Sequence, residues 1–243
     1  MKIFLSELRK LKRSSIILPL LIVPLISVIF GSLNFVFNRE ILTRDWVSLI
    51  TQVYLFYGLF FMPALIGIMC SYSWGLEHKR NNMKLILSSK TSFVKIVLAK
   101  TAVVFCIYAI SQLYLFILYL IAGTLFSFSS PLPLELVGLY IVSSLVAGYL
   151  VCMQSYISLK IKSFTIPIVI AVGFSFLSIL IAQNNVVTAL KYVFSNVSVV
   201  LNMNAFPDTD LSQVDLIIML IMSALVSAIF IGLQVRELKR RVR

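Results

Sequence analysis

Charged residues are scarce in this chain of 243 residues, of which only 12% are Asp, Glu, Lys or Arg. A typical soluble domain is about 25% charged and roughly 45–50% apolar, whereas 60% of these residues are hydrophobic. A soluble protein of this length does not have enough interior to bury so much apolar surface. The composition therefore excludes soluble enzymes and free nucleic-acid binders. The net charge of +12 instead indicates cytoplasmic loops beside an anionic inner leaflet.

Groups that carry chemistry are also few. His78 is the only histidine, and Cys70, Cys106 and Cys152 have neither the CxxC nor the Cys/His spacing of a zinc site. The sequence contains no phosphate-binding loop of the Walker A type and no GxSxG serine motif. We therefore predict no catalytic residue, no metal site and no cofactor.

What the chain does contain is six long stretches without charge, each of at least 20 residues. A membrane-spanning helix needs about 20 mostly apolar residues, so all six can cross a bilayer. The expected fold class is all-α, a polytopic integral membrane protein with six transmembrane helices in one domain over residues 1–243. The predicted spans are about 16–37, 46–74, 101–128, 136–159, 164–190 and 216–235.

The charges between the spans predict the orientation in the membrane. Of the 21 Lys and Arg residues, 18 lie in segments 1–13, 77–100, 160–162 and 236–243. The positive-inside rule assigns these segments to the cytoplasm, which gives a charge of +15 inside and −3 outside. Both termini are then cytoplasmic, and residues 191–215 form the largest external loop. Trp46 and Trp74 bracket the second span, as interfacial anchors do.

The first cytoplasmic segment, residues 1–13, has the pattern of an amphipathic helix. Phe4, Leu8 and Leu11 have i, i+4, i+7 spacing and are surrounded by five basic residues. This pattern predicts a helix that lies on the inner membrane surface before the first span. The alternative is a frayed basic tail that only sets the topology.

The second cytoplasmic segment, residues 77–100, is the longest connection on that side. Met83, Ile86 and Leu87 have i, i+3, i+4 spacing, which predicts a short amphipathic helix with an outward apolar ridge. Such a ridge is suited to a groove on a partner protein. The alternative is a basic loop that lies against lipid headgroups.

Uncharged polar residues inside the spans have two interpretations. They line a path for an amphipathic substrate, or they form hydrogen bonds between helices. Proton- and ion-coupled carriers place charged groups near the middle of the membrane, and no predicted span contains one, which argues against a self-powered transporter. The candidates for the path are Gln52, Tyr54, Tyr57, Gln112 and Gln154.

The basic amphipathic start, the six spans and the loop after the second span together resemble the permease subunits of type-2 ABC exporters. In that loop Glu77, the pair Asn81-Asn82 and Lys84 resemble the family pattern Glu-x-x-x-Asn-Thr-x-Lys, although Met83 departs from it. A small and polar turn, Ser88-Ser89-Lys90, and then Lys100 follow. The resemblance covers nearly the whole chain and is close to the bacteriocin and lantibiotic immunity permeases of Gram-positive bacteria.

The resemblance implies a transport subunit of the cell membrane without an ATPase site of its own. A separate cytosolic ABC ATPase dimer would provide the energy, and a second permease subunit, identical or related, would complete the transporter. The cargo would be an antimicrobial peptide, for which Asp208, Asp210 and Asp215 form an acidic external rim. The alternatives are another hydrophobic cargo, such as a drug, a lipid or a peptide toxin, and a membrane immunity protein that only sequesters a peptide. The residues expected to couple to the ATPase are Glu77, Asn81, Asn82, Met83, Lys84, Ile86 and Leu87.

Overall fold

The computed structural model describes residues 2–12, 16–79, 82–183 and 213–242, and every regular element in these ranges is helical. The all-α class is therefore confirmed for the described residues. The elements are α1 (Lys2–Lys12), α2 (Ile17–Phe37), α3 (Asp45–Phe56), the π-helical turn η1 (Tyr57–Phe61), α4 (Met62–His78), α5 (Asn82–Leu87), α6 (Phe93–Leu125), α7 (Leu134–Val146), α8 (Gly148–Lys160), α9 (Thr165–Gln183) and α12 (Gln213–Arg240).

Five stretches of the described residues are long and apolar enough to cross a membrane, which supports a multi-pass membrane protein. The predicted fifth span, 164–190, corresponds to α9, of which residues 165–177 form a shorter apolar helix. Residues 184–190 lie outside the described residues, so six crossings stay a prediction. The five stretches are Ile17–Phe37, Asp45–His78, Phe93–Leu125, Leu134–Lys160 and Val214–Arg240.

The start of α6 differs most from the predicted boundaries. This helix begins at Phe93 rather than near residue 101, so residues 93–100 of the predicted loop belong to it. At the other end of the same loop, α4 continues to His78. Lysine has a good helix propensity, so Lys95 and Lys100 do not interrupt the helix. A helix boundary that is taken only from the positions of charges is therefore too short.

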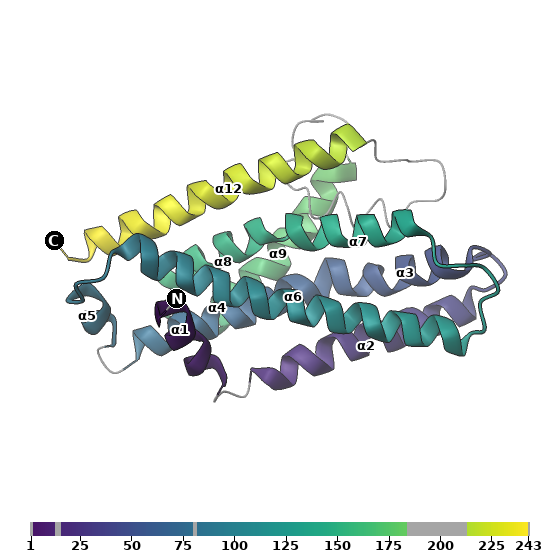
Figure 1. Ribbon diagram of the computed structural model, residues 1–243, viewed down its shortest axis with the longest axis horizontal. Helices are drawn as coiled ribbons and strands as arrows, with labels where there is room; N and C mark the ends of the chain where they lie inside the picture. The colour runs from purple at the N-terminus through teal and green to yellow at the C-terminus, as the bar shows by residue number, and fades with distance from the viewer. Residues whose placement is uncertain (1, 13–15, 80–81, 184–212, 243) are drawn as a thin grey trace.

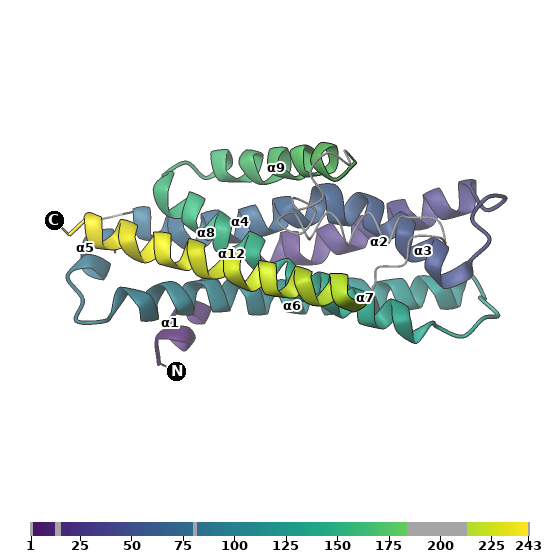
Figure 2. The same cartoon turned by 90° about the horizontal axis from the view of Figure 1, so that it is seen from above.

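The long helices run side by side along the longest axis of the molecule (Figure 1). α1, α5 and the C-terminal part of α12 lie at one end, which we call the α5 end. The connections from α2 to α3 and from α6 to α7 lie at the other end, which we call the Trp46 end. α9 lies to one side of the bundle, where it contacts α4, η1 and α8 (Figure 2).

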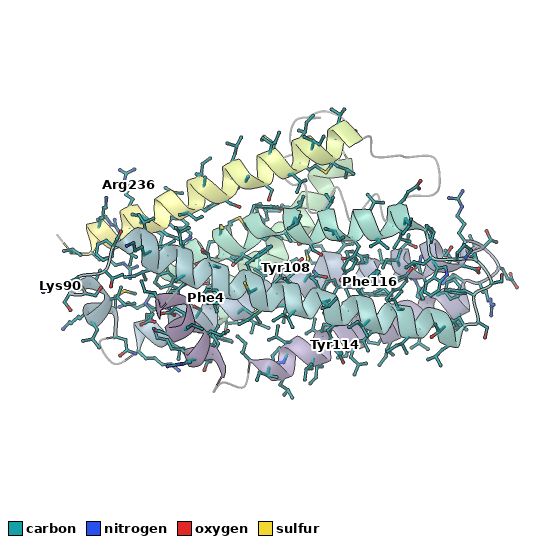
Figure 3. The ribbon with its side chains drawn as sticks, in the orientation of Figure 1. Phe4, Lys90, Tyr108, Tyr114, Phe116 and Arg236 are labelled. Carbon is teal, nitrogen blue, oxygen red and sulfur yellow. The ribbon has the colours of Figure 1, made fainter. Side chains whose placement is uncertain are left out.

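The interior of the bundle is rich in aromatic residues, and its exterior is apolar. Tyr108 is fully buried and lies with Phe116 in the middle of the bundle, whereas Lys90 and Arg236 lie toward the α5 end (Figure 3). Large apolar side chains are exposed along α2, α6, α9 and α12. An exterior of this kind suits the hydrocarbon of a bilayer and would be unfavourable in water.

Two helical stretches are irregular within the apolar region. Residues Tyr57–Phe61 form a π-helical turn between α3 and α4. α7 gives way to α8 at Ala147, and there the Ser223 hydroxyl of α12 donates a hydrogen bond to the Val146 carbonyl oxygen at 2.8 Å. A side chain from a neighbouring helix thus supplies a hydrogen bond at the break, as irregular backbone in a membrane requires.

Candidate functional site

The short helix α5 closes one end of the bundle. The Asn82 side chain donates from Nδ2 to the Leu76 carbonyl oxygen at 2.9 Å, which ties the start of α5 to α4. After the last turn, the Ser89 hydroxyl donates back to the Ile86 carbonyl oxygen at 2.9 Å. Serine side chains that bond to the backbone in this way compete with further helical hydrogen bonds. The helix accordingly has only six residues.

The apolar residues of α5 do not form the single outward ridge that the sequence predicts. Met83 and Leu87 face the bundle, because residues four apart lie on one side of a helix and this side meets a hydrophobic cluster. Ile86 faces α1 across a groove. The outer surface of α5 is formed instead by Lys84 and by Leu85, whose exposed fraction is 69%. The cluster under Met83 and Leu87 consists of Trp74, Val97, Leu159, Val235 and Leu238.

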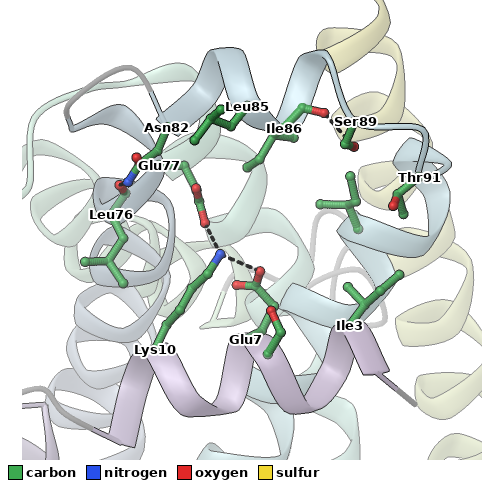
Figure 4. A pocket seen from close by; sticks show the side chains of 12 residues that line it. Ile3, Glu7, Lys10, Leu76, Glu77, Asn82, Leu85, Ile86, Ser89 and Thr91 are labelled. Carbon is green, nitrogen blue, oxygen red and sulfur yellow. Dashed lines mark hydrogen bonds and ion pairs between the residues drawn. The ribbon is translucent and has the colours of Figure 1, made fainter.

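A groove of about 690 Å³ separates α1 from α5 (Figure 4). Its walls carry the apolar side chains of Ile3, Ile86 and Ile96. Glu7 and Lys10 of α1 and Glu77 of α4 also line it, and Figure 4 shows Lys10 between the two carboxylates. The groove therefore opens onto charged groups.

Four charged side chains form a cluster beside this groove. Lys100, near the start of α6, lies with Nζ at 2.7 Å from Oε2 of Glu7 and at 2.8 Å from Oε1 of Glu77. Lys10 lies with Nζ at 2.7 Å from Oε1 of Glu7 and at 2.7 Å from Oε1 of Glu77. We call these four residues the charge cluster. It joins three segments of the chain, namely α1, the end of α4 and the start of α6.

The charge cluster is largely buried, apart from Lys10, and it is balanced because two carboxylates face two ammonium groups. Lys100 is only 1% exposed, and an ammonium group in such a position requires close partners. It gains two more from α4, the Ser73 carbonyl oxygen at 3.4 Å and the Trp74 ring at 5.1 Å. Burial by itself lowers the pKa of Lys10, but hydrogen bonds and the charges of Glu7 and Glu77 outweigh it and raise the pKa above 10.5. Within the part of the chain that the structure describes, no three His, Cys, Asp or Glu side chains gather as a metal site would require.

Sequence reasoning identified only part of this site. Glu77 was predicted as a coupling residue, but its ion-pair partners Lys10 and Lys100, and the second carboxylate Glu7, were not. Glu7 is the only acidic residue before Glu40, and Lys100 is followed by a long apolar run. An isolated acid in a basic segment and a lysine at the edge of an apolar run are the signals that indicate a buried pair. Asn81 lies outside the described residues.

A second set of hydrogen bonds links α4 to α12 through α8. Trp74 is fully buried, and its Nε1 donates to the Ser155 hydroxyl at 2.8 Å. Ser155 in turn donates to Oε1 of Gln234 on α12 at 2.7 Å. Trp74 is thus not the interfacial anchor that the sequence predicts, because its indole N–H finds a partner inside the bundle.

The predicted substrate-path residues are packed inside the bundle. Gln112 contacts the hydroxyl groups of Tyr108 and Tyr140, which connects α6 with α7. Gln52 accepts a hydrogen bond from the Asn34 side chain on α2. These contacts agree with hydrogen bonding between helices. The other three candidates, Tyr54, Tyr57 and Gln154, are fully buried or nearly so. Of the predicted acidic rim, only Asp215 lies within the described residues.

Comparison with protein families identifies a family that covers most of the chain. Residues 3–179 match the family described as ABC-2 family transporter protein. This range takes in all four residues of the charge cluster and the whole of α2 to α8. No curated protein and no solved structure matches the chain.

Proposed function

We propose a function from the premise that this chain belongs to the ABC-2 family of transporter proteins. Members of this family are membrane transport components that work with a separate ABC ATPase. The chain is accordingly a multi-pass permease subunit, and we propose that it forms six transmembrane spans and assembles with an identical or related permease subunit.

The proposed orientation has the α5 end in the cytoplasm. Basic residues of α1, α5, α8 and α12 gather toward this end, whereas the connection between α2 and α3 at the Trp46 end has only Arg39 and Arg44. The positive-inside rule favours the cytoplasm for the more basic end. Both chain termini are then cytoplasmic, and the cell is proposed to be a Gram-positive bacterium from the resemblance in the loop after the second span.

The proposed docking point for the ATPase is α5. The observation that carries this proposal is Leu85, a large apolar side chain that is 69% exposed at the basic end of the molecule. Leu85 and Lys84 form the surface offered to the partner, and Leu85 and Ile86 both border the groove toward α1. Met83 and Leu87 have a supporting role, because they hold α5 on the bundle. An exposed apolar residue beside basic ones suits a groove on a partner protein.

The proposed cargo is a lantibiotic, a bacteriocin or a similar antimicrobial peptide. The support is the resemblance to immunity permeases, together with the acidic residues 208, 210 and 215 on the predicted external side. Export of another hydrophobic cargo, such as a drug, a lipid or a peptide toxin, fits the same architecture. A panel of cationic lantibiotics and hydrophobic drugs, tested on cells with and without the transporter, distinguishes these cargoes by which compounds lose potency.

Co-purification in mild detergent tests the docking proposal. The wild-type chain is expected to carry an ABC ATPase with it, and Leu85→Asp is expected to lose that ATPase while the permease still reaches the membrane. Val242→Asp is the matched control, because Val242 is also an exposed apolar residue at the same end. If Leu85→Asp and Val242→Asp retain equal amounts of ATPase, α5 is not the docking point. If no ATPase accompanies the wild-type chain and cells are still protected, peptide sequestration is the better account.

A further inference from the structure

The charge cluster consists of two ion pairs. One pair lies within α1, and the other joins α4 to α6, against which α1 packs. Glu7 and Lys10 both belong to α1 and pair with each other at 2.7 Å. Glu77 and Lys100 belong to α4 and α6 and pair with each other at 2.8 Å. Two further contacts cross from one side to the other, Lys10 to Glu77 and Lys100 to Glu7, each at 2.7 Å. Among the side chains that the structure describes, these two crossing contacts are the ion pairs that fasten α1 to the bundle.

The charge cluster differs from a single buried ion pair in the charges that remain buried when α1 separates from α4 and α6. Separating the partners of an ordinary buried pair leaves an uncompensated charge, which is strongly unfavourable. If α1 moves away here, Glu7 leaves together with Lys10, and Glu77 stays together with Lys100. Each side keeps a neutral pair, so separation breaks the two crossing contacts without leaving a lone charge on either side.

The surroundings of the cluster also suit a contact that opens. After separation, Lys100 would keep the Ser73 carbonyl oxygen and the Trp74 ring, both on α4. Lys10 and Glu7 already border the groove between α1 and α5, where water can reach them. Phe4 and Leu8 of α1 are half-buried. Because α1 carries basic residues around this apolar side, the same side can rest on the membrane interface.

We infer that α1 is fastened to α4 and α6 by a reversible latch, in which Glu7 and Lys100 are the positioning residues, and that the latch opens when the ATPase acts on α5. This inference rests on the proposed function, in which the ATPase binds α5. Because α5 forms the wall of the groove opposite α1, a movement of the ATPase would act on the groove through α5. The latch is closed without nucleotide and open in the ATP-trapped transporter. α1 then moves away from α5 while the helices of the bundle keep their mutual distances.

Distances between spin labels in the intact permease–ATPase complex test the latch without knowledge of the cargo. One label is attached at Arg9→Cys on α1 and the other at Ser88→Cys after α5, in a background with Cys106→Ser because Cys106 is the exposed native cysteine. A second labelled pair, Lys160→Cys and Arg236→Cys, reports on α8 and α12. For the first pair, the wild-type latch predicts one short distance without nucleotide and a shift to a longer distance after trapping with ATP and vanadate.

The double variant Glu7→Leu/Lys10→Met removes both crossing contacts, because neither new side chain can accept or donate a hydrogen bond, and it leaves the Glu77–Lys100 pair intact. It is expected to show the longer α1 distance in both nucleotide states, with the distance between α8 and α12 unchanged. The matched control is Lys95→Gln, which removes an exposed charge from α6 outside the cluster and should behave as wild type.

Three results overturn the latch. The first is a short α1 distance in the double variant, and the second is a wild-type distance that nucleotide does not change. The third is a variant in which the distance between α8 and α12 broadens as well, because the bundle as a whole is then loosened. An ATPase that binds the wild-type complex while the α1 distance stays fixed contradicts only the latch. Failure of any ATPase to bind the wild-type chain contradicts the proposed function as well.

Discussion

At the Trp46 end the helices are joined mainly by neutral groups, with one carboxylate, Asp45, that accepts from the Ser130 hydroxyl at 2.7 Å, whereas at the α5 end they are joined by ion pairs. The Trp46 ring lies against Gly123, its Nε1 donates to the Ser130 carbonyl oxygen at 2.8 Å, and its own carbonyl oxygen accepts from the Tyr119 hydroxyl at 2.9 Å. The ring also meets Phe128 edge-on at 5.2 Å. No formal charge takes part in these contacts of Trp46.

The comparison indicates that the two ends have different functions. Aromatic rings packed edge to face have one favoured geometry, so the Trp46 end is fixed in shape. The four side chains of the charge cluster can instead exchange partners, because each carboxylate has a choice of two ammonium groups. The end that is proposed to meet the ATPase is thus the end whose contacts can be rearranged.

Breaking the charge balance at the α5 end is expected to have the largest effect on stability. Lys100→Met leaves two buried carboxylates to share Lys10, and removing one partner of a buried ion pair typically costs about 3–5 kcal/mol. The free energy of unfolding, measured by detergent-denaturant titration of the purified permease, should fall by about this amount. Lys95→Met on the exposed side of the same helix should have almost no effect. Equal losses for the two variants would refute the view that Lys100 is held by the cluster.

Filling the space under Trp46 is expected to have the next largest effect. A Cβ atom at Gly123 would lie 2.1 Å from Cζ3 of the Trp46 ring, so Gly123→Ala forces the ring to move. Overpacking of this kind costs about 1–3 kcal/mol, which the same titration can measure. Gly138→Ala is the control, because a Cβ there meets nothing within 4 Å. It should instead stabilise α7 by about 0.5–1 kcal/mol. Equal destabilisation by Gly123→Ala and Gly138→Ala would show that contact with the Trp46 ring is not the cause of the loss.

Alkaline pH should weaken the contacts at the α5 end, and not those at the Trp46 end, without any mutation. The pKa of Lys10 is raised in the folded protein above its ordinary value of 10.5. A raised pKa contributes stability that is fully present below 10.5 and is lost as pH rises through the folded value. Protease cleavage of α1 should therefore be constant through neutral pH and should accelerate only above pH 10.5. If cleavage accelerates near neutral pH, Lys10 is not held in the way that the structure indicates.

The smallest effect is expected in the turn at the Trp46 end. Ser127 has a φ of 54°, a left-handed backbone conformation that costs other residues about 1–2 kcal/mol and glycine much less. Ser127→Gly should stabilise the protein by less than about 1 kcal/mol, because glycine also loses more freedom on folding. A thermal shift assay can detect the change. A fall in the melting temperature would mean that the Ser127 side chain, and not its backbone, stabilises the turn.

The parts that sequence could predict are those set by local patterns. Residues 1–13 have an apolar spacing that repeats within a helix, and the observed α1 runs from Lys2 to Lys12. Five of the six long uncharged runs likewise overlap long apolar helical stretches, because the apolar requirement is met by each segment alone. Residues 184–212, which include most of the predicted external loop, lie outside the described residues, so that prediction stays open.

The parts that sequence missed depend on contacts between distant segments. The amphipathic spacing of Met83 and Leu87 shows that they share a face, but not that this face meets the bundle. The partner of Lys100 lies 93 positions earlier in the chain, at Glu7, so no local pattern could pair them. For the same reason Trp74 was expected at the interface, although its partner Ser155 holds it inside.

α6 extends between the two ends as one helix of 33 residues. At 1.5 Å per residue it is about 50 Å long, compared with about 30 Å for the hydrocarbon core of a bilayer. It contains no proline, and its one glycine, Gly123, lies beneath Trp46. An unbroken helix of this kind acts as a spacer, since it holds Lys100 and the glycine beneath Trp46 at a constant separation. The charged end and the aromatic end of the bundle are thus kept in register across the thickness of the membrane even though no side chain spans that distance.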